Sequence, residues 1–163
     1  MKTKNIALFA MLTAVALILS YVESLIPVLV AVPGVKLGIT NIVVIFALYR
    51  LGTKEAAALS LLRVVLVSFL FGNAFSFLYS LAGAILSLAV MILLKKSDKF
   101  SATGVSVAGA VFHNVGQILV AIVVLSTEKL VLYLPVLAVT GVLAGVVTGL
   151  AASVLLKRVP ESL

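Results

Sequence analysis

The stretch GAVFHNVGQILVA, at positions 109–121, places several polar side chains in an apolar surrounding. It contains the only histidine of the chain, His113, beside Asn114 and four residues before Gln117. Residues three and four apart are neighbours on a helix surface, so these side chains predict one polar face. Such groups can bind a ligand or join helices, and three of them within five positions exceed what joining helices requires. We therefore expect a ligand pocket here.

Arg63 is a second polar residue inside an apolar segment, SLLRVVLVSFLFG. An arginine at the centre of a membrane span costs roughly 2.5–3.5 kcal/mol on insertion scales, so a partner or a wet cavity must compensate it. Counted along the predicted helices, Arg63 and His113 share one layer, and we expect no acidic residue at that depth. A bound anionic ligand would supply the counter-charge. Alternatively, Arg63 hydrogen-bonds to helix carbonyls or reaches Glu55, eight residues earlier.

These residues stand out because the 163-residue chain is 64% hydrophobic and only 10% charged. So few charges could not cover the surface of a soluble domain, and the composition therefore indicates an integral membrane protein. The net charge of +7 does not indicate nucleic-acid binding. The basic residues lie between apolar segments and do not share one face with aromatic residues, as they do in nucleic-acid-binding proteins. Without cysteine, the chain has neither a disulfide nor a thiolate metal site.

Six apolar segments are predicted to cross the membrane, where a span takes about 20 residues and roughly 17 to 25 are tolerated. The second is short and needs help from the loop before it. The expected fold class is an all-α bundle of six transmembrane helices in a single domain, residues 1–163. The first apolar run is longer than the core of a signal peptide, so we expect it to stay uncleaved. The segments are Ile6–Val22, Ile39–Leu51, Ala56–Phe71, Phe75–Leu94, Val105–Leu125 and Leu132–Leu156.

The basic residues are distributed unevenly between the two sides of these spans. Lys36 and Lys129 fall on one side, Arg63 lies within a span, and the other nine of the twelve fall on the opposite side. By the positive-inside rule the richer side is cytoplasmic, and it includes both termini. The nine are Lys2, Lys4, Arg50, Lys54, Lys95, Lys96, Lys99, Lys157 and Arg158.

The connection between the first two spans, LIPVLVAVPGVKLGITN, contains Pro27, Pro33, Gly34 and Gly38. Proline and the Pro-Gly pair oppose a continuous helix. Irregular backbone near membrane depth is tolerated where it packs on protein or lines a cavity, which favours a lid over a site. A re-entrant spacer that lengthens the short second span is an equal alternative.

Small residues repeat at helical spacing in two of the spans. Gly141, Gly145 and Gly149 recur every four residues in the last span and predict close packing of helix backbones. Ala10 and Ala14 in the first span show a weaker form of the same spacing.

The sequence lacks the residues that common catalytic sites need. It contains no P-loop motif for ATP and no G-x-S-x-G motif for a serine nucleophile. Asp98 is the only aspartate, so clustered carboxylates that could hold Mg²⁺ against a diphosphate are missing, and one histidine makes no histidine-based metal site. We therefore expect a protein that is not an enzyme and that binds neither a cofactor nor a metal.

Five segments together resemble the Gx transporter family, which is often labelled heptaprenyl diphosphate synthase component I. They are PGVKLGITNIV, LLRVVLVSFLFG, FSFLYSLAGAILSL, GAVFHNVGQILVA and YLPVLAVTGVLAG. The likeness runs from about Ala7 to Leu156. That family is similar to the substrate-binding S components of energy-coupling factor importers, which implies six helices with both ends cytoplasmic, in a bacterial plasma membrane. It also implies a membrane coupling subunit and two ATPase subunits as partners.

The resemblance assigns roles to particular residues. Ala10 and Ala14 match the small residues that face the coupling subunit in S components. The ligand is expected toward the outer side, under the loop between the first two helices. The candidate substrate-binding residues are Lys36, Asn41, Arg63, Asn73, Tyr79, His113, Asn114 and Gln117.

Two functions from different classes follow. The first is a substrate-binding membrane subunit of an ATP-driven importer for a small anionic or amphipathic organic compound. The second is a non-catalytic membrane subunit that assists a prenyl diphosphate synthase or a membrane redox complex. Catalysis by the chain itself is not expected, because prenyl transfer requires carboxylate-bound Mg²⁺.

Overall fold

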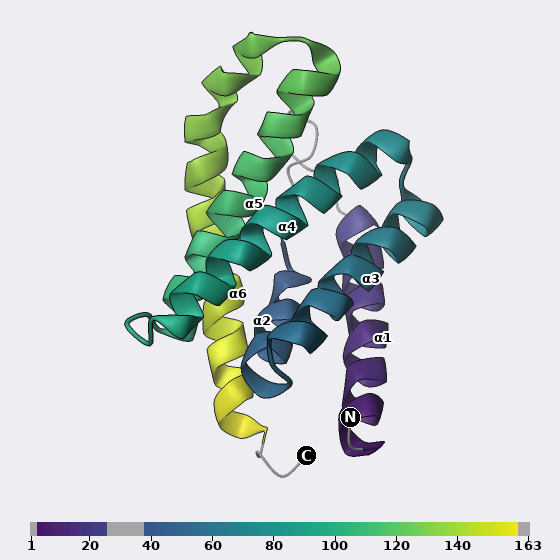
Figure 1. Ribbon diagram of the computed structural model, residues 1–163, viewed down its shortest axis with the longest axis vertical. Helices are drawn as coiled ribbons and strands as arrows, with labels where there is room; N and C mark the ends of the chain where they lie inside the picture. Colours follow the sequence, from purple (N-terminus) through teal and green to yellow (C-terminus); the bar gives the residue numbers. More distant parts are fainter. Residues whose placement is uncertain (1–2, 26–37, 160–163) are drawn as a thin grey trace.

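The computed structural model describes residues 3–25 and 38–159, and these residues are almost entirely helical, with no strand among them. Figure 1 shows the arrangement, which confirms the expected all-α class. In chain order the elements are α1 (Thr3–Leu25), α2 (Asn41–Arg50), α3 (Thr53–Phe71), α4 (Ala74–Lys96), α5 (Ala102–Leu125), the 3-10 helix η1 (Glu128–Tyr133) and α6 (Leu134–Arg158).

The six α-helices coincide with the six predicted spans, but only four segments are long and apolar enough to cross a bilayer alone. These are α1, α4, α5 and the continuous η1–α6 segment. Helix α2 has only ten residues, and α3 contains Lys54, Glu55 and Arg63. The chain is thus an all-helical membrane protein, and the count of six spans stays a prediction.

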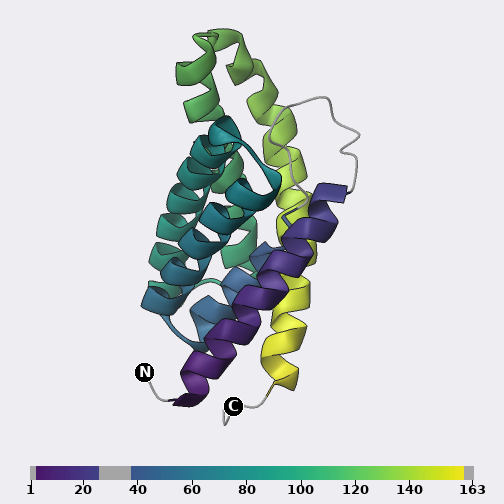
Figure 2. The ribbon, with the colours of Figure 1, turned by 90° about the vertical axis from the view of Figure 1, so that its right-hand side faces the viewer.

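The helices run up and down between two ends of the molecule (Figures 1 and 2). The start of α1, the end of α6 and the α2–α3 turn lie at one end, and the α4–α5 connection points toward it. The α3–α4 and α5–α6 turns lie toward the other end, where the α5–α6 hairpin reaches farthest. The two termini therefore belong to the same end of the bundle, as the charge distribution predicts.

Helix α2 forms the centre of the bundle, in contact with α1, α3, α5 and α6. Six consecutive residues, Val43 to Leu48, are buried, so this helix is covered by protein on every side. A helix that is hydrophobic all round is suited to such a position. At 1.5 Å per residue α2 is only about 15 Å long, half of a hydrocarbon core of about 30 Å. Its N-terminus therefore begins deep inside the bundle.

Glycines bring α4, α5 and α6 into direct backbone contact. A Cβ atom added at Gly145 would lie 2.6 Å from the Cα of Val107, and one at Gly116 would lie 2.8 Å from the carbonyl oxygen of Ala82. Gly141 and Gly149 approach the backbone of α5 in the same way. The prediction that the glycine repeat packs helices together is confirmed.

Two basic side chains hold helix ends at the end of the bundle that contains the termini. Arg50, the last residue of α2, donates hydrogen bonds to the carbonyls of Leu156 and Val159 at the end of α6. Lys95 of α4 donates to the carbonyl of Leu48 at 2.5 Å, near the end of α2. Cations are favourable at helix C-termini, where carbonyl groups lack partners within the helix. These contacts join α2, α4 and α6.

Candidate functional site

The described residues place a polar network where α2 begins. Glu23, near the end of α1, is only 8% exposed. One carboxylate oxygen accepts a hydrogen bond from the backbone N–H of Gly38 at 2.5 Å, and the other accepts from the Thr40 hydroxyl at 3.3 Å. Thr40 also bonds to the Ser20 hydroxyl at 3.0 Å, and because Thr40 has a single proton, Ser20 is then the donor. This network fixes α1 to the start of α2.

Local sequence explains this geometry. Ser20 and Glu23 are three residues apart and lie on one face of α1, which is also its buried face. Gly38 has a positive φ of 70°, a conformation that favours glycine and that presents its N–H to Glu23. Glu23 was not among the predicted site residues, although a serine and a glutamate on one helix face inside an apolar run indicate such a role.

Arg63 lies in the middle of α3, which packs against α1. Its Nε atom is buried and has no hydrogen-bond partner, and the side chain forms no hydrogen bond or ion pair with any other described residue. The negative charge of Glu23 nevertheless acts on the guanidinium group. Glu23 is therefore the acidic residue whose charge reaches Arg63, because the end of α1 turns it into the bundle.

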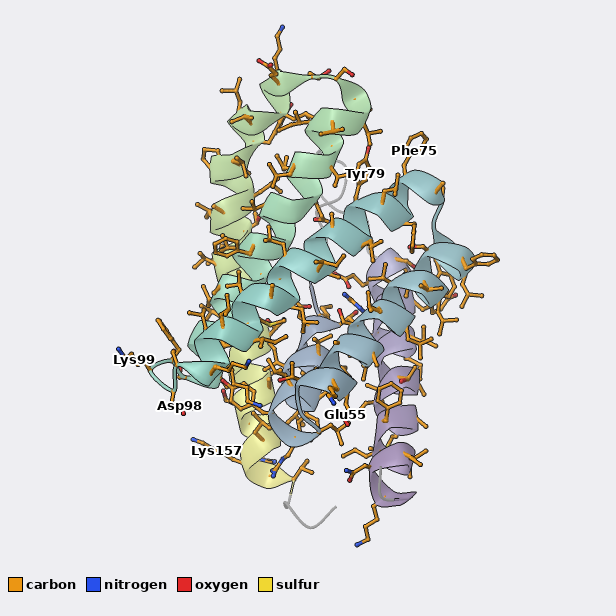
Figure 3. The ribbon with its side chains drawn as sticks, in the orientation of Figure 1. Glu55, Phe75, Tyr79, Asp98, Lys99 and Lys157 are labelled. Atoms are coloured by element: carbon orange, nitrogen blue, oxygen red, sulfur yellow. The ribbon has the colours of Figure 1, made fainter. Side chains whose placement is uncertain are left out.

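Neither structural alternative for Arg63 occurs among the described residues. No hydrogen bond joins it to a helix carbonyl, and Glu55 lies near the start of its own helix, where its carboxylate approaches Gly52. Figure 3 shows Glu55 toward the end of the bundle where the termini lie. The guanidinium group keeps hydrogen-bond donors available for a ligand.

Two further amide side chains are buried in the bundle, one of them at the start of α2. Asn41 is the first residue of α2 and is 8% exposed, and Gln117 of α5 is 7% exposed. Neither side chain has a hydrogen-bond partner in residues 3–25 and 38–159. Their amide groups therefore keep donors and acceptors that another molecule could use.

His113 and Asn114 point to different helices, which corrects the prediction of one shared polar face. The imidazole of His113 lies against Gly83 of α4, where an added Cβ atom would be 2.9 Å from its Nδ1. The Asn114 amide donates to the carbonyl of Leu137 in α6 at 2.8 Å. Asn114 thus joins α5 to α6, which is the structural alternative for this motif.

The remaining candidates differ in how the structure uses them. The side chain of Asn73 accepts a hydrogen bond from the backbone N–H of Ser76 at 2.8 Å and thereby caps α4. Tyr79 is partly buried on the N-terminal part of α4, far from the end that contains Glu55 and Lys157 (Figure 3). Lys36 and most of the predicted lid lie outside the described residues. Their assignment to a ligand stays a prediction.

The alanines predicted to contact a partner lie on the outside of the bundle. Ala10 and Ala14 are both exposed, on the face of α1 opposite to the buried Leu12, Ala16 and Ser20. Their small side chains are therefore not used to pack this chain. The face remains open to lipid or to another subunit.

The arrangement can attract an anion but cannot assemble a metal site from the described residues. The N-terminus of a helix carries about half a positive charge, and that of α2 begins with Asn41, next to the Thr40 hydroxyl that donates to Glu23. Half-helix N-termini at mid-membrane bind anionic groups in transporters. No group of three or more His, Asp or Glu side chains within residues 3–25 and 38–159 is placed to hold a metal ion. These features define a helical membrane protein with a buried polar site.

The comparisons with known proteins identify the family. The family described as heptaprenyl diphosphate synthase component I matches residues 12–155, nearly the whole chain. The chain therefore belongs to the heptaprenyl diphosphate synthase component I family, as its sequence resemblance predicted. The searches among curated proteins and among solved structures gave no match.

Proposed function

We propose that this chain is the substrate-binding membrane subunit, similar to an S component, of an ATP-driven energy-coupling factor importer. Its substrate is a small anionic or amphipathic organic compound. The observation that carries this proposal is the half-buried Arg63, whose buried Nε atom has no hydrogen-bond partner among the described residues. A buried donor without a partner is costly, so the site is best explained as one that a ligand completes.

Asn41, Gln117 and the positive end of α2 supply the remaining recognition groups. Asn41 and Gln117 offer amide donors and acceptors without partners in the described chain. His113, Tyr79, Asn73, Asn114 and Lys36 remain candidate contacts. A capture subunit needs such a site but performs no chemistry, so the chain acts without catalysis and without a cofactor.

The proposed topology has six spans with both termini in the cytoplasm of a bacterial cell. Support comes from the start of α1 and the end of α6, which lie at one end of the bundle together with Arg50 and Lys157. A single cysteine in place of Lys96 should react with an impermeant reagent only after the cells are opened. Labelling in intact cells would refute this topology.

The proposed partners are a membrane coupling subunit and two ATPase subunits. The exposed position of Ala10 and Ala14 supports this assignment, because small residues let two helix backbones approach closely.

The family name supports a second candidate. A component I of heptaprenyl diphosphate synthase would be a non-catalytic membrane subunit that assists a soluble synthase. A membrane redox complex is a further form of this assisting role. The two proposals differ in the proteins that should accompany the chain.

Co-purification distinguishes them. The tagged chain, isolated from membranes of the organism that encodes it, should carry ATPases and a coupling protein, and Ala14→Leu should remove them. Ala58→Leu, on the exposed surface of α3, is the matched control and should retain them. Recovery of a soluble synthase without ATPases would refute the importer and support the second candidate.

A further inference from the structure

Glu23 is buried, and its negative charge acts on the half-buried Arg63, but the two side chains form no ion pair. Glu23 accepts hydrogen bonds only from Gly38 and Thr40 within the described residues, and both donors are uncharged. Arg63 feels the charge of Glu23 but forms no ion pair with it. Each charge is therefore only partly compensated by the described residues.

The charge balance of this region limits what it can bind. Among the described residues, Arg63 contributes one positive charge, Glu23 contributes one negative charge, and the N-terminus of α2 adds about half a positive charge. A metal-free diphosphate carries at least two negative charges near neutral pH, and one of them would face Glu23 without a cation. Like charges in a poorly hydrated site repel strongly, because the effective dielectric constant is low.

The other described cations do not change this balance. The lysine residues of α3 and α4 lie near the end of the bundle that contains the termini, where Lys95 binds the end of α2. Lys129 belongs to the exposed η1 at the opposite end. No cluster of carboxylates among the described residues could hold a divalent cation for a diphosphate.

We propose that Glu23 determines the charge selectivity of this site, admitting a compound that is zwitterionic or carries one net negative charge and excluding multiply charged anions such as a diphosphate. The inference rests on the proposed function, since it assumes that Arg63 binds the negative group of the ligand. A zwitterion would compensate both charges, with its cation toward Glu23 and its anion toward Arg63. Glu23 is thus a specificity residue and also holds the start of α2.

The test measures binding of inorganic diphosphate, in metal-free buffer of fixed ionic strength, to the full chain in a neutral detergent. The parent should bind it weakly or not at all. Glu23→Gln keeps a carbonyl acceptor for the Gly38 N–H but removes the negative charge, so it should bind diphosphate at least tenfold more tightly, about 1.4 kcal/mol. Glu23→Asp keeps the charge and should resemble the parent.

Two controls locate the effect. Glu128→Gln removes an exposed acidic charge from η1 at the end opposite the termini and should leave diphosphate binding unchanged. Adding Arg63→Gln to Glu23→Gln should abolish the gain. If Glu23→Gln does not retain its helical circular dichroism, Glu23→Ala provides a second neutral variant for the same comparison.

The outcomes separate this inference from the proposed function. Equal diphosphate binding by the parent and by the neutral variants, whether tight or absent, would overturn the selectivity assigned to Glu23 and leave the role of Arg63 standing. A gain that persists after Arg63→Gln would overturn both, because the anion would then bind away from Arg63.

Discussion

The helices of the bundle pack differently in two regions, α4–α6 and α1–α3. In α4, α5 and α6, glycines bring backbones together and polar side chains pair across the helices, as in the Ser106–Thr148 hydrogen bond of 3.0 Å. In α1, α2 and α3 the helices contain no glycine, and the half-buried Arg63 and the buried Asn41 form no side-chain hydrogen bond in the described chain. The first region is held by backbone contacts, although its Ser87 hydroxyl and Gln117 amide also form no hydrogen bond with the described residues, whereas the second leaves a charged group without a direct partner among them.

This difference assigns separate tasks to the two regions. A region held together by close backbone contacts has little to gain from another molecule. A region with unpaired polar groups is stabilised when a ligand supplies the missing partners, since a molecule that binds only the folded state adds to its stability. The first therefore serves as a scaffold, and the second provides the site.

The largest effect is expected from a side chain placed between α5 and α6. In Gly145→Leu the new Cβ atom would meet the Cα of Val107 at 2.6 Å and the carbonyl of Ser106 at 3.1 Å, and neither backbone atom can move without its helix. Overpacking typically costs about 1–3 kcal/mol and occasionally more, and we expect the upper part of this range. The loss of stability is measured from the thermal unfolding of the variant and the parent in detergent, followed by helical circular dichroism.

Gly104→Ala is the matched control for this prediction. An added Cβ atom there would lie 3.6 Å from the nearest atom, Ser101 Oγ, which is an ordinary contact. Because alanine favours helices more than glycine does, the melting temperature should stay the same or rise slightly. If Gly145→Leu melts like this control, the scaffold role of α5 and α6 is wrong.

A smaller change in stability is expected from alanine-to-leucine substitutions on the buried and exposed faces of α1. Ala16 is 0% exposed and belongs to the core around α2, so Ala16→Leu should lower the free energy of unfolding by about 1–2 kcal/mol. Ala14→Leu adds the same atoms on the exposed face and should leave the melting of the isolated chain unchanged. Equal destabilisation by both substitutions would show that the outer face of α1 also packs within this chain.

The smallest effect is expected when the stabilities of two asparagine-to-alanine variants are compared. Asn114→Ala removes the hydrogen bond to the Leu137 carbonyl and should lower the free energy of unfolding by about 0.6 kcal/mol, the average for such bonds in membranes. Asn41→Ala removes an amide without a hydrogen bond in the described chain and should leave the ligand-free protein equally stable. A reversed order in the melting temperatures of the two variants would contradict the comparison between the regions.

Sequence patterns predicted the helices and the glycine packing because both depend on local properties. Apolar runs locate helices in any membrane protein, and the four-residue spacing of Gly141, Gly145 and Gly149 places them on one helix face. The family was also recognisable from the segments around Arg63 and His113.

The composition of the site was harder to predict because it depends on contacts between distant segments. Glu23 is buried only because the chain returns at Gly38 and Thr40 to supply donors. His113 and Asn114 are adjacent in sequence, and successive residues on a helix do not share a face. His113 therefore contacts α4, whereas Asn114 contacts α6. The spacing alone indicated a polar patch but not which helix would face each side chain.

The contacts of Arg50 have a consequence for the order in which the protein assembles. Its guanidinium group binds carbonyls of Leu156 and Val159, more than one hundred residues later in the chain. During synthesis α2 therefore emerges long before the helix end that it stabilises. A ten-residue helix is marginal when isolated, so α2 depends on its neighbours, and its contacts with α6 can form only after α6 has been synthesised. The packing around the centre of this bundle is therefore completed last.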